Sequence, residues 1–187
     1  MTLARFFYLC LFLLAAGSGY YLFDKEQPSV IQVAPNVELP MFSGKRLENV
    51  TYNQQGVRNY VITSQQLDFY AESGHTTFDY PVLKVYRNGS TQEWQLSAKR
   101  GILTKQQILI LYDDVVAYNL LTDSSFEKLT TNKMSIQLDN RDFWADSQIT
   151  LIGPQFETRG QAMKGNLSDH SAILYNRVQG RYETFTP

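Results

Sequence analysis

The stretch WQLSAKRGIL, residues 94–103, holds the clearest indication of how this chain folds. Trp94, Leu96 and Ala98 alternate with polar residues, and this two-residue period is typical of a β-strand with one buried face. After Ala98 the period slips by one position before Gly101 and Leu103 resume it. A small residue at such a slip allows a strand to turn a corner between two sheets. The stretch therefore predicts a strand that alternates, bends and alternates again.

The same pattern occurs in three further copies, and the four starts fall 34, 33 and 29 residues apart. The copies begin at Ile62, Leu96, Leu129 and, in a weaker form, Thr158, and each has a small residue two positions later. Repetition at this period predicts a stacked or rolled sheet in which each unit covers the apolar face of its neighbour. So loose a pattern can also arise by chance, but the strand interpretation does not depend on the repeat.

The other segments beyond residue 47 also alternate and break at turn residues. Asn88-Gly89 is a strong hairpin signal, because a type I′ turn needs positive φ at both central residues. Two further sets of apolar residues are each expected to share one inward face: Ile108, Ile110 and Tyr112, and then Met134, Ile136 and Leu138. No stretch beyond residue 47 keeps a helical period for three turns, so the sequence predicts an all-β domain.

The chain starts with an uncharged apolar segment, residues 6–23. Within it, Ala15–Ser18 resembles the cleavage site of a signal peptide. Against cleavage, apolar residues resume at Tyr20–Phe23, and the whole segment reaches roughly 27 Å as a helix, at the lower limit for crossing the hydrocarbon of a bilayer. Arg5 is the only charged side chain on its N-terminal side, so an anchor would leave residues 1–5 in the cytoplasm. The residues favour a retained anchor, with a removed signal peptide as the alternative.

Residues 24–46 contain three prolines and no regular period. We interpret them as a tether that leads to the folded domain. The domain is then expected to occupy residues 47–187, a length that suits one folded unit.

Composition argues against several functions. Beyond the apolar segment the chain has 16 basic and 18 acidic residues and no basic run, so nucleic acid is not an expected partner. Cys10 is the only cysteine, so the domain has neither disulfides nor thiolate metal sites. His75 and His170 have no second ligand at suitable spacing, and no nucleophile, phosphate-loop or calcium-loop motif occurs. We therefore expect no metal, no cofactor and no catalytic activity.

Eighteen aromatic residues remain after the apolar segment, many of them on alternating positions. They either fill the core of a sandwich or line a trough between two splayed sheets that accepts an acyl chain. Alternation alone leaves both interpretations open.

The chain resembles the LptC family of lipopolysaccharide-export proteins of Gram-negative inner membranes. The resemblance covers essentially the whole chain, including the position and length of the apolar segment. It rests on the order and spacing of short motifs: Val50–Gly56 with Tyr60, Thr77–Leu83, Trp94 with Ser97–Lys99, Leu111-Tyr112, Leu129–Thr131, Leu151–Gly153 and Gly160–Leu167.

That resemblance implies a twisted, open β-jellyroll behind one transmembrane helix, a fold shared with the soluble bridge protein LptA. It implies an inner-membrane anchor that associates with the LptB–LptF–LptG transporter. It also implies a trough that receives the acyl chains of lipopolysaccharide and passes them to LptA, with no hydrolysis by this chain. A soluble lipid carrier released by signal cleavage is the alternative function.

Four inward positions are the expected lipid contacts: Phe78, Tyr112, Ala172 and Leu174. Phe78 and Ala172 are flanked by polar residues, as in a strand that lines a trough, and Leu174 shares the parity of Ala172. The parity that Tyr112 shares with Ile108 and Ile110 places it in the interior.

Gly56 and Gly153 are expected to serve backbone geometry and docking. Gly56 closes the turn that begins at Asn53, and Gly153 lies between Ile152 and Pro154. At positive φ a side chain would cost about 1 kcal/mol or more.

The two ends of the domain are expected to have different partners. The first strands, around residues 47–53, should face the transporter, while the last strands should offer an open edge to LptA by β-augmentation. The residues expected on that last edge are Ala172, Ile173, Leu174, Tyr175, Tyr182 and Phe185.

Overall fold

The computed structural model describes residues 38–121, 124 and 126–182, together with positions 12, 18 and 20. Within these residues, no helix has both the length and the apolar character needed to cross a membrane. Apart from those three positions, the predicted anchor at residues 6–23 lies outside the described residues, as do Phe185 and most of the predicted tether. The chain divides into two compact units, Met1–Val37 and Glu38–Pro187, and the second unit is the β-domain.

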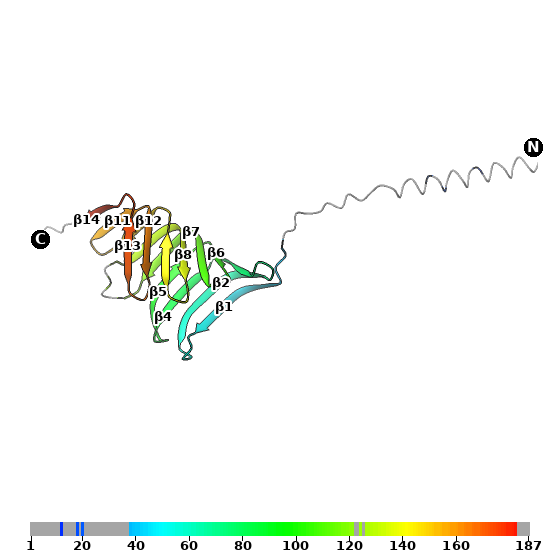
Figure 1. Cartoon of the computed structure of the whole chain (residues 1–187), viewed down its shortest axis with the longest axis horizontal. Helices are drawn as coiled ribbons and strands as arrows, with labels where there is room; N and C mark the ends of the chain where they lie inside the picture. The colour runs from blue at the N-terminus through cyan, green and yellow to red at the C-terminus, as the bar shows by residue number, and fades with distance from the viewer. Residues whose placement is uncertain are drawn as a thin grey trace, which may run out of the picture. The chain divides into compact units, whose positions relative to one another are not determined.

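The described residues of this domain form fourteen strands, every pair of which is antiparallel, so the all-β prediction is confirmed (Figure 1). The strands are β1 (Phe42–Tyr52), β2 (Arg58–Tyr70), β3 (His75–Asp79), β4 (Val82–Arg87), β5 (Thr91–Ser97), β6 (Arg100–Leu103), β7 (Ile108–Asn119), β8 (Lys128–Gln137), β9 (Asp142–Ala145), β10 (Ile149–Ile152), β11 (Phe156–Gly160), β12 (Ala162–Asn166), β13 (Ser171–Tyr175) and β14 (Gln179–Tyr182).

The strands make one hydrogen-bonded sheet that bends into two halves. Half-sheet I contains β4, β5, β10, β11 and β14, and half-sheet II contains β3, β6, β9, β12 and β13. The long strands β1, β2, β7 and β8 run through both halves. For example, β2 pairs with β4 through Tyr60–Thr63 and with β3 through Gln66–Tyr70. The domain is therefore a jellyroll whose two halves share their longest strands.

The chain passes from one half to the other along a row of bends. In β7 the register shifts between Tyr112 and Val115, where Asp113 and Asp114 both have positive φ. In β1 the bend falls at Arg46, with φ of 51°. Asp and Asn tolerate this left-handed conformation better than most residues, which explains why two aspartates occupy the bend of β7.

The repeat predicted from the sequence marks these bends. Ser64, Ala98, Thr131 and Gly160 are all buried, and each lies where its strand leaves half-sheet I. A small side chain is needed there because the two halves approach each other most closely where they join. The corner interpretation of the repeat is thus confirmed.

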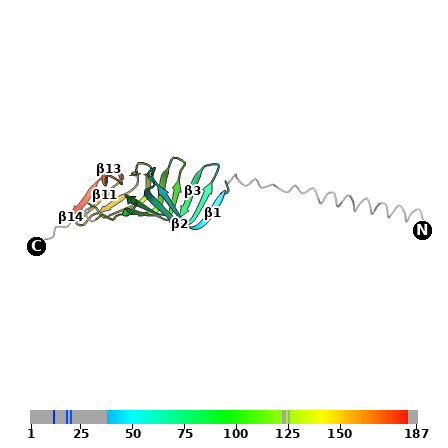
Figure 2. The same cartoon turned by 90° about the horizontal axis from the view of Figure 1, so that it is seen from below.

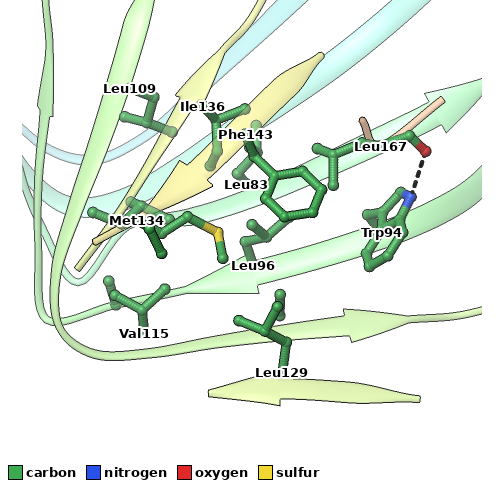
Figure 3. Packing of buried hydrophobic residues seen from close by; sticks show 14 of the residues in the cluster. Leu83, Trp94, Leu96, Leu109, Val115, Leu129, Met134, Ile136, Phe143 and Leu167 are labelled. Carbon is green, nitrogen blue, oxygen red and sulfur yellow. Dashed lines mark hydrogen bonds between the residues drawn. The ribbon is translucent and has the colours of Figure 1, made fainter. Parts of the chain in front are cut away.

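The apolar core lies between the two halves. Figure 3 shows Leu83, Leu96 and Leu129 of half-sheet I packed in one cluster with Leu109 and Ile136 of half-sheet II. The predicted inward sets of β5 and β8 are confirmed, since their exposed fractions do not exceed 8%. In this structure the interior is filled by side chains, as in a sandwich core.

One predicted set has the wrong parity. On β7, Leu109 and Leu111 are fully buried, whereas Ile108, Ile110 and Tyr112 are partly exposed on the outer face. Every residue from Ile108 to Tyr112 is apolar or aromatic, so the sequence carries no alternation in this segment. Pairing with β6 and β8 decides which set faces inward.

One turn and the start of the domain can be compared with their predictions. Asn88 and Gly89 have φ of 52° and 74°, as the hairpin signal required. The start of the domain was placed too late, because β1 begins at Phe42 inside the predicted tether. The polar stretch before Leu47 hides this strand in the sequence, but it pairs with β2 from Phe42 onward.

The sheet ends on two opposite sides in strands that have one unpaired edge. Among the described strands, β1 pairs only with β2, β13 only with β12, and β14 only with β11. Figures 1 and 2 both place β1 at one end of the domain and β13 and β14 at the other. The jellyroll is therefore open at both ends, as expected.

Candidate functional site

The interior is partly open to solvent at strand β13. Ala172 and Leu174 point toward the core and pack against it while remaining partly exposed. Their neighbours Ile173 and Tyr175 point outward and are 58% and 37% exposed. The edge strand thus presents two apolar side chains to the interior, in the parity that the sequence predicted.

Phe78 lies deeper in the same interior. It is 2% exposed on β3, where it pairs with Leu67 of β2 and with Gly101 of β6. Its inward orientation agrees with the prediction. An acyl chain could reach it only if the two half-sheets moved apart.

Tyr112 does not join this group. Its ring lies on the outer face of β7, between the cationic groups of Lys133 and Arg100, at 5.4 and 6.0 Å from the ring centroid. The parity argument that assigned Tyr112 to the interior was wrong, and on the outer face its ring makes cation–π contacts with the two cations.

Gly56 has the backbone conformation that was predicted. Its φ is +74°, and a Cβ built on it would meet nothing within 4 Å. The Asn53 carbonyl accepts a 3.0 Å hydrogen bond from Gly56 N, while the Asn53 side chain accepts one from Val57 N at 2.9 Å. The constraint at Gly56 is therefore conformational and not steric.

Gly153 serves a different purpose from the predicted one. It is not among the residues with positive φ. A Cβ at this position would instead lie 2.2 Å from Cε1 of Phe156, because the ring packs directly over the glycine. The β10–β11 hairpin is closed by a 2.9 Å hydrogen bond from Gly153 N to Phe156 O. Close approach of a ring, and not backbone conformation, requires glycine here.

The predicted docking edge has an exposed surface. Tyr182 of β14 is 75% exposed, and its ring centroid lies 6.3 Å from that of Phe156. With Ile173 and Tyr175 of β13, it gives the open end an apolar and aromatic surface. Phe185 lies outside the described residues.

Opposite the row of bends, the free strand ends of the two halves face each other, and we call this side the mouth. Several polar contacts cross it. Trp94 Nε1 donates a buried 2.8 Å hydrogen bond to the carbonyl of Leu167 (Figure 3). Arg87 donates to Nε2 of His170 at 2.8 Å, and the His170 ring stacks on Trp94. These contacts hold the mouth closed over the core.

Arg141 makes the other contacts across the mouth. Its guanidinium donates to Asn59 Oδ1 at 2.5 Å and to the Tyr86 carbonyl at 2.9 Å. Burial lowers the pKa of Arg141, the carboxylate of Glu93 opposes this effect, and the positive charge of Arg87 adds to it. The group therefore lies in a partly desolvated environment, with one acid and one further arginine close enough to affect it.

Glu93 is the buried acid of this region. It is 1% exposed and forms an ion pair with Arg87, with His170 Nε2 at 3.7 Å. A carboxylate at such depth is normally paired, because removing it from water is costly. Glu93, Arg87 and Arg141 were missed in the sequence because they are far apart in it and form no run or motif.

Within the described part of the chain, no group of three or more His, Cys, Asp or Glu side chains is positioned to hold a metal ion. His75, one of the two histidines considered, stacks on Tyr70 with ring centroids 4.7 Å apart.

The architecture defines a class: an antiparallel sheet bent into an open, twisted β-jellyroll. A solved structure with this fold is that of LptH, described as the LptA-homologous periplasmic component of the lipopolysaccharide transport device of Pseudomonas aeruginosa. It matches with a TM-score of 0.54 over 67% of this chain and 95% of that chain, at 7% sequence identity. At this identity the likeness shows the fold alone.

Sequence comparison gives the family. Residues 8–183 match the family model described as lipopolysaccharide-assembly, LptC-related, and the chain belongs to this family. One similar protein is the lipopolysaccharide export system protein LptC of Haemophilus influenzae, 28% identical over 187 residues, with 91% of this chain and 90% of that protein covered. Another is LptC of Escherichia coli K12, 28% identical over 158 residues, with 84% and 83% covered. The resemblance seen in the sequence is confirmed.

Proposed function

We propose that this chain takes part in lipopolysaccharide transport across the Gram-negative envelope, as a scaffold for the lipid and not as an enzyme. The observation that carries the proposal is the apolar interior between two half-sheets, which ends at an edge strand whose inward residues Ala172 and Leu174 are partly exposed. Membership of the LptC-related family and the names of its relatives support the same role.

The physical need for such an interior is large. Each CH₂ exposed to water costs about 0.8 kcal/mol, so exposing an acyl chain of about a dozen carbons would cost roughly 10 kcal/mol. The chain therefore needs a continuous apolar cover while it crosses water. Because the interior is filled in the closed structure, lipid enters by separating the half-sheets at the mouth. Phe78, Ala172 and Leu174 then line the trough, while the sugars stay in water.

The position in the envelope follows from the same proposal. The segment at residues 6–23 anchors the chain in the inner membrane with residues 1–5 in the cytoplasm, and it associates there with the LptB–LptF–LptG transporter. The family match begins at residue 8, within this segment, which supports an anchor over a soluble carrier. The transporter supplies the energy by hydrolysing ATP, and this chain hydrolyses nothing.

The two open ends supply the connections. The β1 end receives lipopolysaccharide from the transporter, and the β13–β14 end pairs with LptA by β-augmentation. Exposed Ile173 and Tyr182 support this assignment, since an unpaired edge with apolar residues normally has a partner.

A complementation experiment tests the function. The full chain is expressed in a Gram-negative strain depleted of its own LptC, and surface lipopolysaccharide is measured with growth. We expect both to be restored. A chain that is produced and folded but restores neither would contradict the proposal.

A further inference from the structure

Three arginines from separate parts of the chain line one pocket at the mouth. The pocket has a volume of about 380 Å³ and lies between the turn after β1, the β4–β5 hairpin and the turn before β9. Arg58 comes from the start of β2, Arg87 from the end of β4 and Arg141 from the turn before β9. The pocket therefore joins half-sheet I to half-sheet II.

The positive charge of this pocket is only partly neutralised. Arg58 donates to the Gly89 carbonyl at 2.9 Å and lies over the Tyr86 ring at 3.9 Å. Arg141 donates to carbonyl, amide and hydroxyl oxygens, all of them neutral. Among the residues that the structure describes, only Arg87 of the three has a carboxylate partner, the buried Glu93. Among the described residues that line the pocket, none is Asp or Glu, so three cations face one carboxylate.

This arrangement is unfavourable when the pocket is empty. Like charges in a partly desolvated site repel one another more strongly than they do in water. The lowered pKa of Arg141 is caused first by burial; the Glu93 carboxylate opposes this effect, and the charge of Arg87 adds a smaller part through this repulsion. An anion in the pocket would remove it.

The chemistry of the pocket favours one kind of anion. Guanidinium groups bind the oxygens of a phosphoryl group in pairs, which is why arginine is preferred at phosphate sites. The remaining lining includes the carboxamides of Asn53, Gln55, Asn59 and Asn88, which suit the hydroxyl groups of a sugar. The volume falls in the range of small-molecule pockets and accommodates a phosphoryl group with part of an attached sugar.

We propose that the Arg58–Arg87–Arg141 pocket binds a phosphoryl group on the sugar of the transported glycolipid. The proposal rests on the proposed function and deepens it. The pocket lies at the mouth, directly outside the apolar interior, which is where a headgroup would be held while its acyl chains lie between the half-sheets. Arg87 and Arg141 also hold the mouth closed, so a bound phosphoryl group would engage the residues that bridge the two halves.

The test compares two preparations of lipopolysaccharide, one intact and one enzymatically dephosphorylated, binding to the purified full chain in detergent. The variants are Arg58→Gln, which removes a charge from the pocket surface, and Arg141→Lys, which keeps the charge but cannot form the bidentate hydrogen bonds of a guanidinium group. Arg100→Gln is the matched control, since Arg100 is paired with Asp113 on the bend side. Circular dichroism confirms that each variant is folded.

We expect Arg58→Gln and Arg141→Lys each to weaken binding of intact lipopolysaccharide by about tenfold, the effect of losing one charged hydrogen bond. Dephosphorylated lipopolysaccharide should bind wild type and all variants alike, and Arg100→Gln should behave as wild type. Equal losses with both preparations, or no loss with either, would overturn the phosphoryl assignment and leave the proposed function standing. Wild type that binds neither preparation would overturn both.

A final arm identifies the source of the phosphoryl group. Inorganic phosphate and an acidic peptide are titrated into the wild-type complex with lipopolysaccharide. For a headgroup site, millimolar phosphate should displace intact lipopolysaccharide only weakly, because acyl contacts are kept. If either probe saturates the pocket while lipopolysaccharide binding is unchanged, the site serves a free anion or a protein partner, and the headgroup proposal is wrong.

Discussion

Gly153 offers a sharp test of the packing at the open end of the jellyroll. The change is Gly153→Ala, whose Cβ would lie 2.2 Å from Cε1 and 2.7 Å from Cδ1 and Cζ of Phe156. Because carbon atoms pack at about 3.5 Å, the ring must move by roughly 1.3 Å. Such overpacking typically costs about 1–3 kcal/mol. The cost should not exceed about 3 kcal/mol, because at that point the Phe156 ring could leave the core for water instead.

The measurement is a double-mutant cycle on the free energy of unfolding, with denaturant melts of wild type, Gly153→Ala, Phe156→Ala and the double variant. Gly153→Ala should destabilise the wild-type background by about 1–3 kcal/mol and be nearly neutral once Phe156 is alanine. If the alanine costs the same in both backgrounds, the constraint at Gly153 is in its backbone and the steric account is refuted.

Three further predictions follow from individual contacts. Gly56→Val should lower the free energy of unfolding by about 1–2 kcal/mol, and Gly56→Asn by less, because only φ is strained there; equal losses in denaturant melts would contradict this. Trp94→Phe should cost about 1–3 kcal/mol in the same assay, since the buried Leu167 carbonyl loses its donor; an unchanged midpoint would show that the bond contributes nothing. Deleting residues 170–187 should abolish capture of LptA in a pull-down while association with the transporter persists; retention of LptA, or loss of the transporter, would refute the assignment of the two ends.

The local alternation of apolar and polar residues was sufficient to predict much of the fold. Alternation placed Trp94, Leu96 and Ala98 inward, and the small residues of the repeat marked the bends. It failed on β7, where apolar residues occupy both faces and only pairing with β6 and β8 selects Leu109 and Leu111. Alternation needs a contrast between faces, and this segment has none.

Less of the candidate site could be predicted from the sequence. Positive φ at Gly56 could be expected from its turn, but the ring over Gly153 depends on how the β10–β11 hairpin closes. The arginines at the mouth, Arg58, Arg87 and Arg141, meet only because the sheet bends back on itself. Contacts between residues so distant in the chain leave no local signal.

The central claim is that lipopolysaccharide passes through the interior, and strand β13 tests it most directly. A photo-crosslinking amino acid is placed in living cells at inward Ala172 and Leu174 and, as matched controls one residue away, at outward Ile173 and Tyr175. The account predicts lipopolysaccharide adducts at the two inward positions and none at the two outward ones. Equal labelling at all four, or adducts only at the outward pair, would show that the lipid does not travel between the half-sheets.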